Sequence, residues 1–161
     1  MGDLRKGIVA RFPVLISSKR INFTLKSRIK LMDDVSHIEW AKNRMIFKNI
    51  NLSKEGDKLY IKGKIRKTLH YFNRYKRNDI YQENVKKHCI VYIPFEISST
   101  INENVMASGN ELFHCYPRSS KIVDSIRVVN DNSHKIIYDY MKITIELDII
   151  QEKYIKIPPR D

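Results

Sequence analysis

The chain has 161 residues, of which 42% are hydrophobic and only five each are Gly and Pro. This length and composition are typical of one folded domain with its own core, and they exclude a disordered or low-complexity protein. The formal net charge of +12 is uneven, because residues 1–90 hold 22 Lys and Arg against 8 Asp and Glu, whereas residues 91–161 hold 8 against 10. A basic first half suits a polyanionic partner or contacts between copies, although a general preference for Lys would also produce it.

Apolar and polar residues alternate along most of the chain, which predicts strands. In the first half these strands cover residues 14–18, 21–31, 44–52 and 58–72, the last two joined as a hairpin by a turn at 54–57. Residues 33–41 are predicted instead to form a short capped helical turn, in which Val35, Ile38 and Trp40 face inward.

Residues 73–84 are rich in charge and Asn and have no clean period, so we expect an exposed loop there. The remaining predicted elements are strands at 85–101, 112–117, 121–130, 135–150 and from 152, a loop at 102–111 and a turn at 130–134. Proline cannot donate a ladder hydrogen bond, so Pro94 is expected at a sheet edge, a bulge or a strand end, and Pro117 is expected to end its strand. About eight strands with at most one short helix predict an all-β single domain over residues 1–161, folded as an antiparallel β-sandwich or barrel.

Motifs of enzymes and metal sites are missing from the sequence, which has no glycine-rich nucleotide loop, nucleophile elbow or zinc-protease signature. The dipeptides His88-Cys89 and His114-Cys115 contain four possible zinc ligands, but neighbouring residues of a strand point to opposite faces and cannot easily bind one ion. We therefore expect no catalytic residue, metal or cofactor. One disulfide between Cys89 and Cys115 is an alternative, since two cysteines are too few for a disulfide framework.

Signals for membrane insertion or export are also missing. The basic N-terminal segment has no apolar run long enough for a signal peptide, and no run approaches the roughly 18 apolar residues of a membrane span. We expect a protein that is made and kept on the cytosolic side of the cell.

Residues 58–72 raise the main functional question, because one face of this predicted strand is apolar and the other is basic. The inward side holds Leu59, Ile61, Gly63, Ile65, Leu69 and Tyr71, and the outward cations are Lys58, Lys62, Lys64 and Arg66. Successive outward residues lie about 7 Å apart, within one Debye length of about 8–10 Å, so the cations repel one another.

Three interpretations of the basic row are open. It could bind nucleic acid, with Tyr60 and Phe72 stacking on bases, it could protect an exposed sheet against unwanted pairing, or it could dock on an acidic protein. Because no aromatic residues cluster at the centre of the row in the sequence, protection or a protein partner is favoured over nucleic acid.

The order of these pieces resembles the SPOCS domain of spore coat proteins and of the spore-engulfment partner protein of Bacillus and Clostridium relatives. The residues that carry the resemblance are Lys58-Leu59, Gly63, Arg66-Lys67, Tyr71, Lys87-His88, Val91 and Ile93-Pro94-Phe95. They lie within residues 44–150, whereas residues 1–43 match less clearly. The single-domain length is similar to that of the morphogenetic coat-protein branch.

The resemblance implies a non-enzymatic structural protein of the spore coat or outer spore envelope. Such a protein would be made in the mother cell and recruited by contacts with other coat proteins or with copies of itself, as a homo-oligomer. The basic face at Lys58, Lys62, Lys64 and Arg66 is then the expected docking surface for acidic partners. The alternative function is a nucleic-acid-binding β-barrel module that uses the same strand.

Overall fold

The computed structural model describes residues 8–32, 35–53, 57–77, 80–101, 113–131 and 134–157. The six elements within these ranges are all strands: β1 (Ile8–Leu31), β2 (Val35–Leu52), β3 (Lys58–Arg77), β4 (Ile80–Thr100), β5 (Phe113–Asp131) and β6 (His134–Ile157). The predicted loop at 102–111 and the centres of the turns predicted at 54–57 and 130–134 lie outside the described residues. The predicted all-β class is confirmed.

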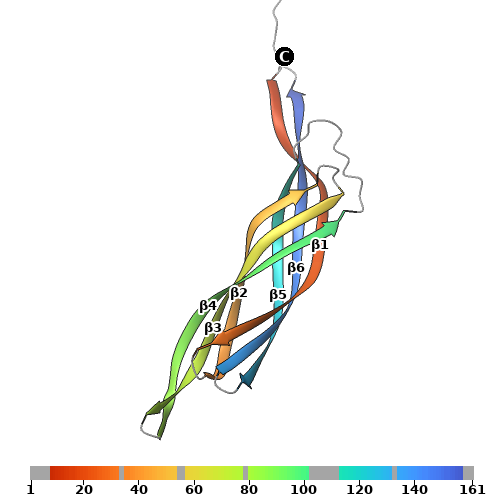
Figure 1. Ribbon diagram of the computed structural model, residues 1–161. Helices are drawn as coiled ribbons and strands as arrows, with labels where there is room; N and C mark the ends of the chain where they lie inside the picture. The colour runs from red at the N-terminus through yellow and green to blue at the C-terminus, as the bar shows by residue number, and fades with distance from the viewer. Residues whose placement is uncertain are drawn as a thin grey trace, which may run out of the picture.

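The strands form two separate three-stranded antiparallel sheets, ordered β1-β6-β5 and β2-β3-β4 (Figure 1). The chain begins in the first sheet, builds the second as a meander, and returns to the first. β1 and β6 pair along nearly their whole length, from Ile8 opposite Ile157 to Leu31 opposite Lys135. The prediction of a closed barrel is therefore wrong, and β3 and β6 are the only strands of these sheets with a neighbour on both sides.

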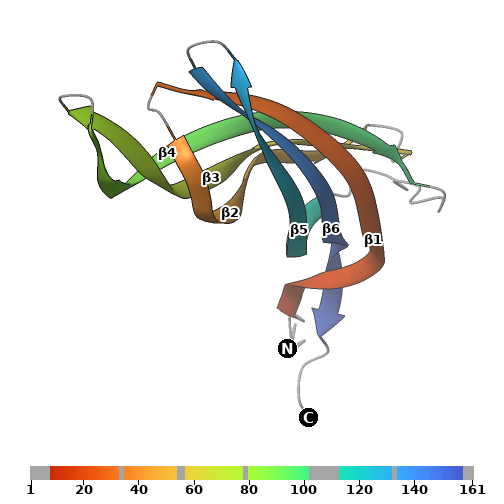
Figure 2. The same cartoon turned by 90° about the horizontal axis from the view of Figure 1, so that it is seen from below.

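Buried side chains from both sheets belong to one hydrophobic cluster. Ile61, Ile65 and Leu69 of β3 are almost completely buried, as are Ile143 and Ile145 of β6. Each such side chain contributes about 1.5–3 kcal/mol when it leaves water. The two sheets also approach each other at β1 and β4, where the centroids of the Phe23 and Phe95 rings lie 5.6 Å apart. The strands of both sheets are visibly curved (Figure 2).

The prediction of about eight strands is wrong, because segments predicted as separate strands are continuous in β1, β5 and β6. In β1 the register shifts between Leu15 and Ser17 without ending the strand. In β5 Pro117 pairs with Leu147 and is followed by a shift at Ser119. Since β5 pairs only with β6, a proline there can leave its missing N–H on the unpaired side. Pro94 lies in β4, the edge strand of its sheet, as predicted.

The helical turn predicted at 33–41 is a strand from Val35 onward, and residues 33–34 lie outside the described residues. Two register shifts, between Val35 and His37 and between Ile38 and Trp40, add an extra residue each. The inward positions are therefore spaced by three at Val35, Ile38 and Ala41, a spacing that imitates a helix. Trp40, predicted to face inward, is on the outer face and 42% exposed.

The prediction of an exposed loop at 73–84 is also wrong, because the described backbone there is strand. β3 runs to Arg77 and β4 starts at Ile80, and the two strands remain paired out to this end. In Figure 1 this hairpin end, coloured green, extends beyond the rest of the molecule. Charged and Asn-rich sequence, with a register shift between Asn73 and Tyr75, hides the alternation that identifies other strands.

Candidate functional site: a basic and aromatic sheet face

The outer face of the β2-β3-β4 sheet, turned away from the core, combines cations with aromatic rings. We call it the basic–aromatic face. Its cations are Lys42, Arg44, Lys58, Lys62, Lys64 and Arg66, and its rings are Trp40, Tyr60, His70, Phe72, His88 and Tyr92. They come from all three strands, so the surface exists only after the sheet has formed.

The four predicted cations of β3 are all on this face, on the side opposite to the buried odd-numbered residues. Lys58 and Lys62 are exposed, whereas Lys64 and Arg66 are half-buried. Lys62 pairs with Glu96 of β4 at 3.1 Å between Nζ and Oε2. The Nζ of Lys64 lies 4.3 Å from the centroid of the Tyr92 ring, close enough for a cation–π contact.

Three rings form a stacked row that crosses the sheet from β2 to β4. The Trp40 and His70 rings lie 3.6 Å apart with an angle of 17° between their planes. The His70 and His88 rings lie 5.8 Å apart. Each pair consists of directly opposed residues on neighbouring strands. Exposed rings of this kind offer flat surfaces on which another ring can stack.

Tyr60 and Phe72, the two residues predicted to stack on bases, lie far apart along β3. Tyr60 is 47% exposed near one end of β3. Phe72 lies twelve positions further along and stacks on His37, with 4.8 Å between ring centroids. The structure therefore does not bring Tyr60 and Phe72 together, and the ring in contact with a cation of this face is that of Tyr92, next to Lys64.

Arg66 is at the centre of the basic–aromatic face and has an unsatisfied donor. It is opposed by Arg44 on β2 and by Tyr92 on β4. Among the described residues its Nε is buried and has no hydrogen-bond partner. Like charges directly opposite each other are destabilising, and a buried donor without an acceptor costs about 1–3 kcal/mol. An anionic group bound between the two guanidinium groups would remove both costs.

The acidic side chains that the structure describes between residues 113 and 157 do not form a patch complementary to the basic–aromatic face. All five acidic side chains described between residues 113 and 157 are already next to a cation of the same chain. The pairs are Lys67 with Asp124 and Asp139, Arg20 with Glu146, Arg118 with Asp148, and Arg11 with Glu152. Hydrogen bonds from Arg20 and Ser119 lower the pKa of Glu146 accordingly.

A second group of polar residues lies inside the molecule, where Lys67 has no solvent exposure at all. Its Nζ lies 2.5 Å from Oδ2 of Asp124 on β5 and 2.8 Å from Oδ2 of Asp139 on β6. It also donates a hydrogen bond to Oδ1 of Asn43 on β2, at 3.2 Å. We call Asn43, Lys67, Asp124 and Asp139 the buried polar cluster; it joins the two sheets.

The two carboxylates of the buried polar cluster differ in their surroundings. Burial raises the pKa of Asp124, but hydrogen bonds from Lys67 and Asn43 outweigh it and hold the pKa below its ordinary value. Burial raises the pKa of Asp139, and Lys67 offsets only part of that effect. Neither oxygen of Asp139 has a well-aligned hydrogen bond from the described residues, so its contact with Lys67 is an ion pair only.

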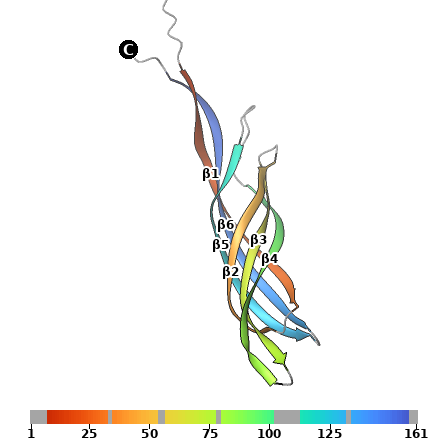
Figure 3. The same cartoon turned by 90° about the vertical axis from the view of Figure 1, so that its left-hand side faces the viewer.

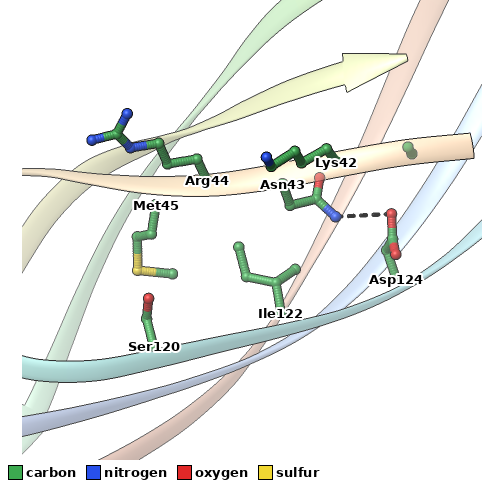
Figure 4. Close-up of a pocket in the computed structure, with 8 residues that line it drawn as sticks. Lys42, Asn43, Arg44, Met45, Ser120, Ile122 and Asp124 are labelled. Carbon is green, nitrogen blue, oxygen red and sulfur yellow. Dashed lines mark hydrogen bonds between the residues drawn. The ribbon is translucent and has the colours of Figure 1, made fainter. Parts of the chain in front are cut away.

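An open groove of about 460 Å³ leads from the surface to this cluster. It lies between β2 and β5, the edge strands that run side by side where the two sheets meet (Figure 3). Asn43 and Met45 project from β2 towards Ser120, Ile122 and Asp124 of β5, and Asn43 donates a hydrogen bond to Asp124 (Figure 4). The groove gives the side chains of Asn43 and Asp124 contact with solvent.

The buried polar cluster could have been found in the sequence from residue parity. Position 67 falls on the inward side of the alternation in 58–72, and position 139 falls on the inward side of the alternation in 135–150. A lysine and an aspartate that interrupt two apolar faces can only remain buried as a pair. Asn43 and Asp124 gave no such signal, because β2 is bulged near Asn43 and both side chains are half-buried.

Neither cysteine belongs to the two sites, and of the four possible zinc ligands only His88 lies on the basic–aromatic face. Cys89 and Cys115 are not joined by a disulfide, and they belong to strands of different sheets. Both pack against the core, and burial raises the pKa of the Cys115 thiol. In the described ranges no group of three or more His, Cys, Asp or Glu side chains could hold a metal ion.

Comparisons with known proteins add no relatives. A scan against protein-family models, a search of the curated proteins and a search of the solved structures each returned no match. The resemblance to the SPOCS domain therefore stays a prediction from the sequence. Within the six described segments, no helix has the length and apolar character needed to cross a membrane.

Proposed function

We propose that this chain is a non-enzymatic binding and assembly protein whose basic–aromatic face docks on an acidic surface of another protein. The observation that carries the proposal is the position of Arg66, with Arg44 opposite, Tyr92 beside it and a buried Nε that lacks an acceptor. Trp, Tyr and Arg are the residue types that dominate the energy of protein interfaces. Glu96 and Glu39, which pair with Lys62 and Lys86, interrupt the positive charge in a way that suits a protein surface of mixed polarity.

The same proposal includes the fold and the setting. We infer that the two sheets pack as a β-sandwich, which is supported by the shared hydrophobic cluster and by the ion pairs of Lys67. The resemblance to the SPOCS domain suggests the spore coat or outer envelope as the place of assembly, with other coat proteins as partners. Because the acidic side chains described in β5 and β6 already have cations, an acidic coat protein is a better partner for this face than a second copy.

Charge reversal tests the docking surface. The variant Lys62→Glu, Lys64→Glu and Arg66→Glu should lose spore localisation and lower the affinity for an acidic partner about tenfold or more, because like charges now face each other. Its melting temperature should change little, since the inward residues of β3 are untouched. The matched control reverses Lys26, Lys30 and Lys142, three exposed cations on the outer face of the other sheet. Equal localisation of both variants and the parent would overturn the proposal.

Single-stranded nucleic acid is the second candidate partner, and the stacked row of Trp40, His70 and His88 favours it. Base stacking on an exposed ring contributes about 1–3 kcal/mol, and phosphate contacts make affinity fall steeply with salt. Filter binding of single strands and duplex at two salt concentrations separates the two partners. Tight binding of single strands that weakens with salt and with Trp40→Ala supports nucleic acid, whereas binding that ignores both changes excludes this face.

A further inference from the structure

The buried polar cluster brings together a primary amine, an amide and two carboxylates. The side chains of Lys67 and Asp139 are shielded from water, whereas those of Asn43 and Asp124 line the groove. Lys67 and Asn43 are directly opposed residues of β3 and β2, so their side chains start from neighbouring positions on the same face of the sheet. The amine nitrogen lies 3.2 Å from the amide oxygen of Asn43. This inference concerns the interior and does not depend on the proposed function of the outer face.

Asp124 lies between the amine nitrogen of Lys67 and the amide nitrogen of Asn43. Its Oδ2 is 2.5 Å from Nζ of Lys67 and 3.0 Å from Nδ2 of Asn43. One carboxylate oxygen can therefore accept a proton from the amine and pass a proton to the amide nitrogen. Holding reactants in such an arrangement replaces an intermolecular encounter and contributes much of the rate of acyl transfer.

We propose that Lys67 and Asn43 condense into an isopeptide bond that ties β3 to β2, with Asp124 as the residue that transfers the protons. Asp124 first takes a proton from the Lys67 ammonium group, which leaves a neutral amine and a neutral acid. The amine lone pair attacks Cγ of Asn43 and forms the Nζ–Cγ bond. Asp124 gives its proton to Nδ2 and takes the surplus proton from Nζ, and the Cγ–Nδ2 bond breaks. Ammonia leaves, so the atoms and charges balance without an oxidant or co-reactant.

The surroundings favour this reaction over a permanent ion pair. A lysine with no exposure has lost its hydration, and condensation converts its charge into a neutral amide. Burial raises the pKa of Asp139, so this carboxyl group can take up a proton from solvent once the cation next to it is gone. The groove between β2 and β5 is lined by Asn43 and Asp124 and gives ammonia a way out.

Asn43 is a better acceptor than Asp124 itself. The amide is neutral and turns its oxygen towards the amine and its nitrogen towards Asp124, the only orientation that satisfies both hydrogen bonds. Condensation with Asp124 would instead require hydroxide or water to leave from an ionised carboxylate. The two routes differ in the molecule that is lost, ammonia or water, which makes them distinguishable by mass.

The test is the intact mass of the purified full-length chain, followed by digestion and fragmentation. We expect a mass lower by one ammonia than the sequence requires, and a branched peptide joining Lys67 to Asn43. Asp124→Asn, which keeps the shape of the side chain but cannot transfer protons, should retain the full mass, as should Lys67→Met. Lys64→Met, on the outer face of the same strand, should still lose ammonia.

Any of three other outcomes would overturn the proposal. A full mass after prolonged incubation of the folded parent chain means that no bond forms. Loss of water mapped to Lys67 and Asp124 assigns a different acceptor. Loss of ammonia that persists in Lys67→Met indicates ring closure of an asparagine and not a cross-link.

Discussion

Gly63 has no room for a side chain, because the Phe95 ring covers it from the neighbouring strand. A Cβ at this position would lie 2.6 Å from Cζ of Phe95 and 2.7 Å from the backbone oxygen of Ile46. The ring could turn away, but the backbone of β2 cannot move without breaking its pairing with β3. The glycine is therefore required by close packing across two strands.

Replacing Gly63 by Ala should lower the free energy of unfolding by about 1–3 kcal/mol, the usual cost of overpacking a core. Urea denaturation of the variant and the parent measures the difference. Pairing it with Phe95→Leu, which removes the ring, should recover part of the loss. An alanine variant as stable as the parent would show that Phe95 does not cover Gly63 in solution.

Lys67→Met should lower the free energy of unfolding by about 3 kcal/mol or more, because the folded variant has neither the cation nor the cross-link of Lys67 next to Asp124 and Asp139. Burial then raises the pKa of Asp139 further above the unfolded value of about 3.9, because the cation that offset part of this effect is gone. The folded state of the variant binds more protons than the unfolded state, so its stability should fall as the pH rises through that window and beyond. Denaturation of this variant from about pH 4 to about pH 7 checks the sign. Stability that rises with pH would contradict burial of the carboxylates.

The elements were predictable where alternation is regular and hidden where bulges interrupt it. Residues 58–72 and 135–150 keep period two, and the structure places strands with buried inward residues there. In 33–41 two bulges within six residues change the period to three, which favoured a helix. At Pro117 a strand end was expected, but whether a proline ends a strand depends on which side of the strand lacks a neighbour, and distant pairing decides that.

The position of each strand in its sheet leads to a prediction for hydrogen exchange. β3 and β6 have partners on both sides, whereas β1, β5, β2 and β4 each have one unpaired edge. Amides of β3 between Leu59 and Tyr71 should therefore exchange more slowly than those of β4 opposite them, measured by mass spectrometry of peptic fragments. Equal exchange in β3 and β4 would indicate a different strand order.

At the scale of the whole molecule, pairing of the first strand with the last decides the architecture. Nothing in the sequence near Ile8 or Ile157 indicates that these residues are opposite each other, so a closed barrel and two sheets could not be separated in advance. The basic–aromatic face likewise depends on how the strands pair. The sequence predicted the cations of β3, but Trp40, Arg44 and Tyr92 join them only through the register of neighbouring strands.

The partners of the acidic side chains in the folded molecule also differ from those that the sequence suggested. The slightly acidic second half suggested head-to-tail contact with the basic first half. The acidic side chains that the structure describes between residues 113 and 157 instead pair with cations of the same chain, for example Glu146 with Arg20 at 2.6 Å. The basic–aromatic face therefore needs a partner that brings its own negative charge.

The most direct test of that claim uses Trp40, because the chain contains a single tryptophan and it is on the basic–aromatic face. Its fluorescence can be quenched with acrylamide while the protein is titrated with polyglutamate, and separately with a single-stranded oligonucleotide. We predict that at least one of these polyanions shields Trp40 from acrylamide, and that Lys62→Glu, Lys64→Glu and Arg66→Glu together remove the shielding. Binding detected by sedimentation that leaves the quenching of Trp40 unchanged would contradict it.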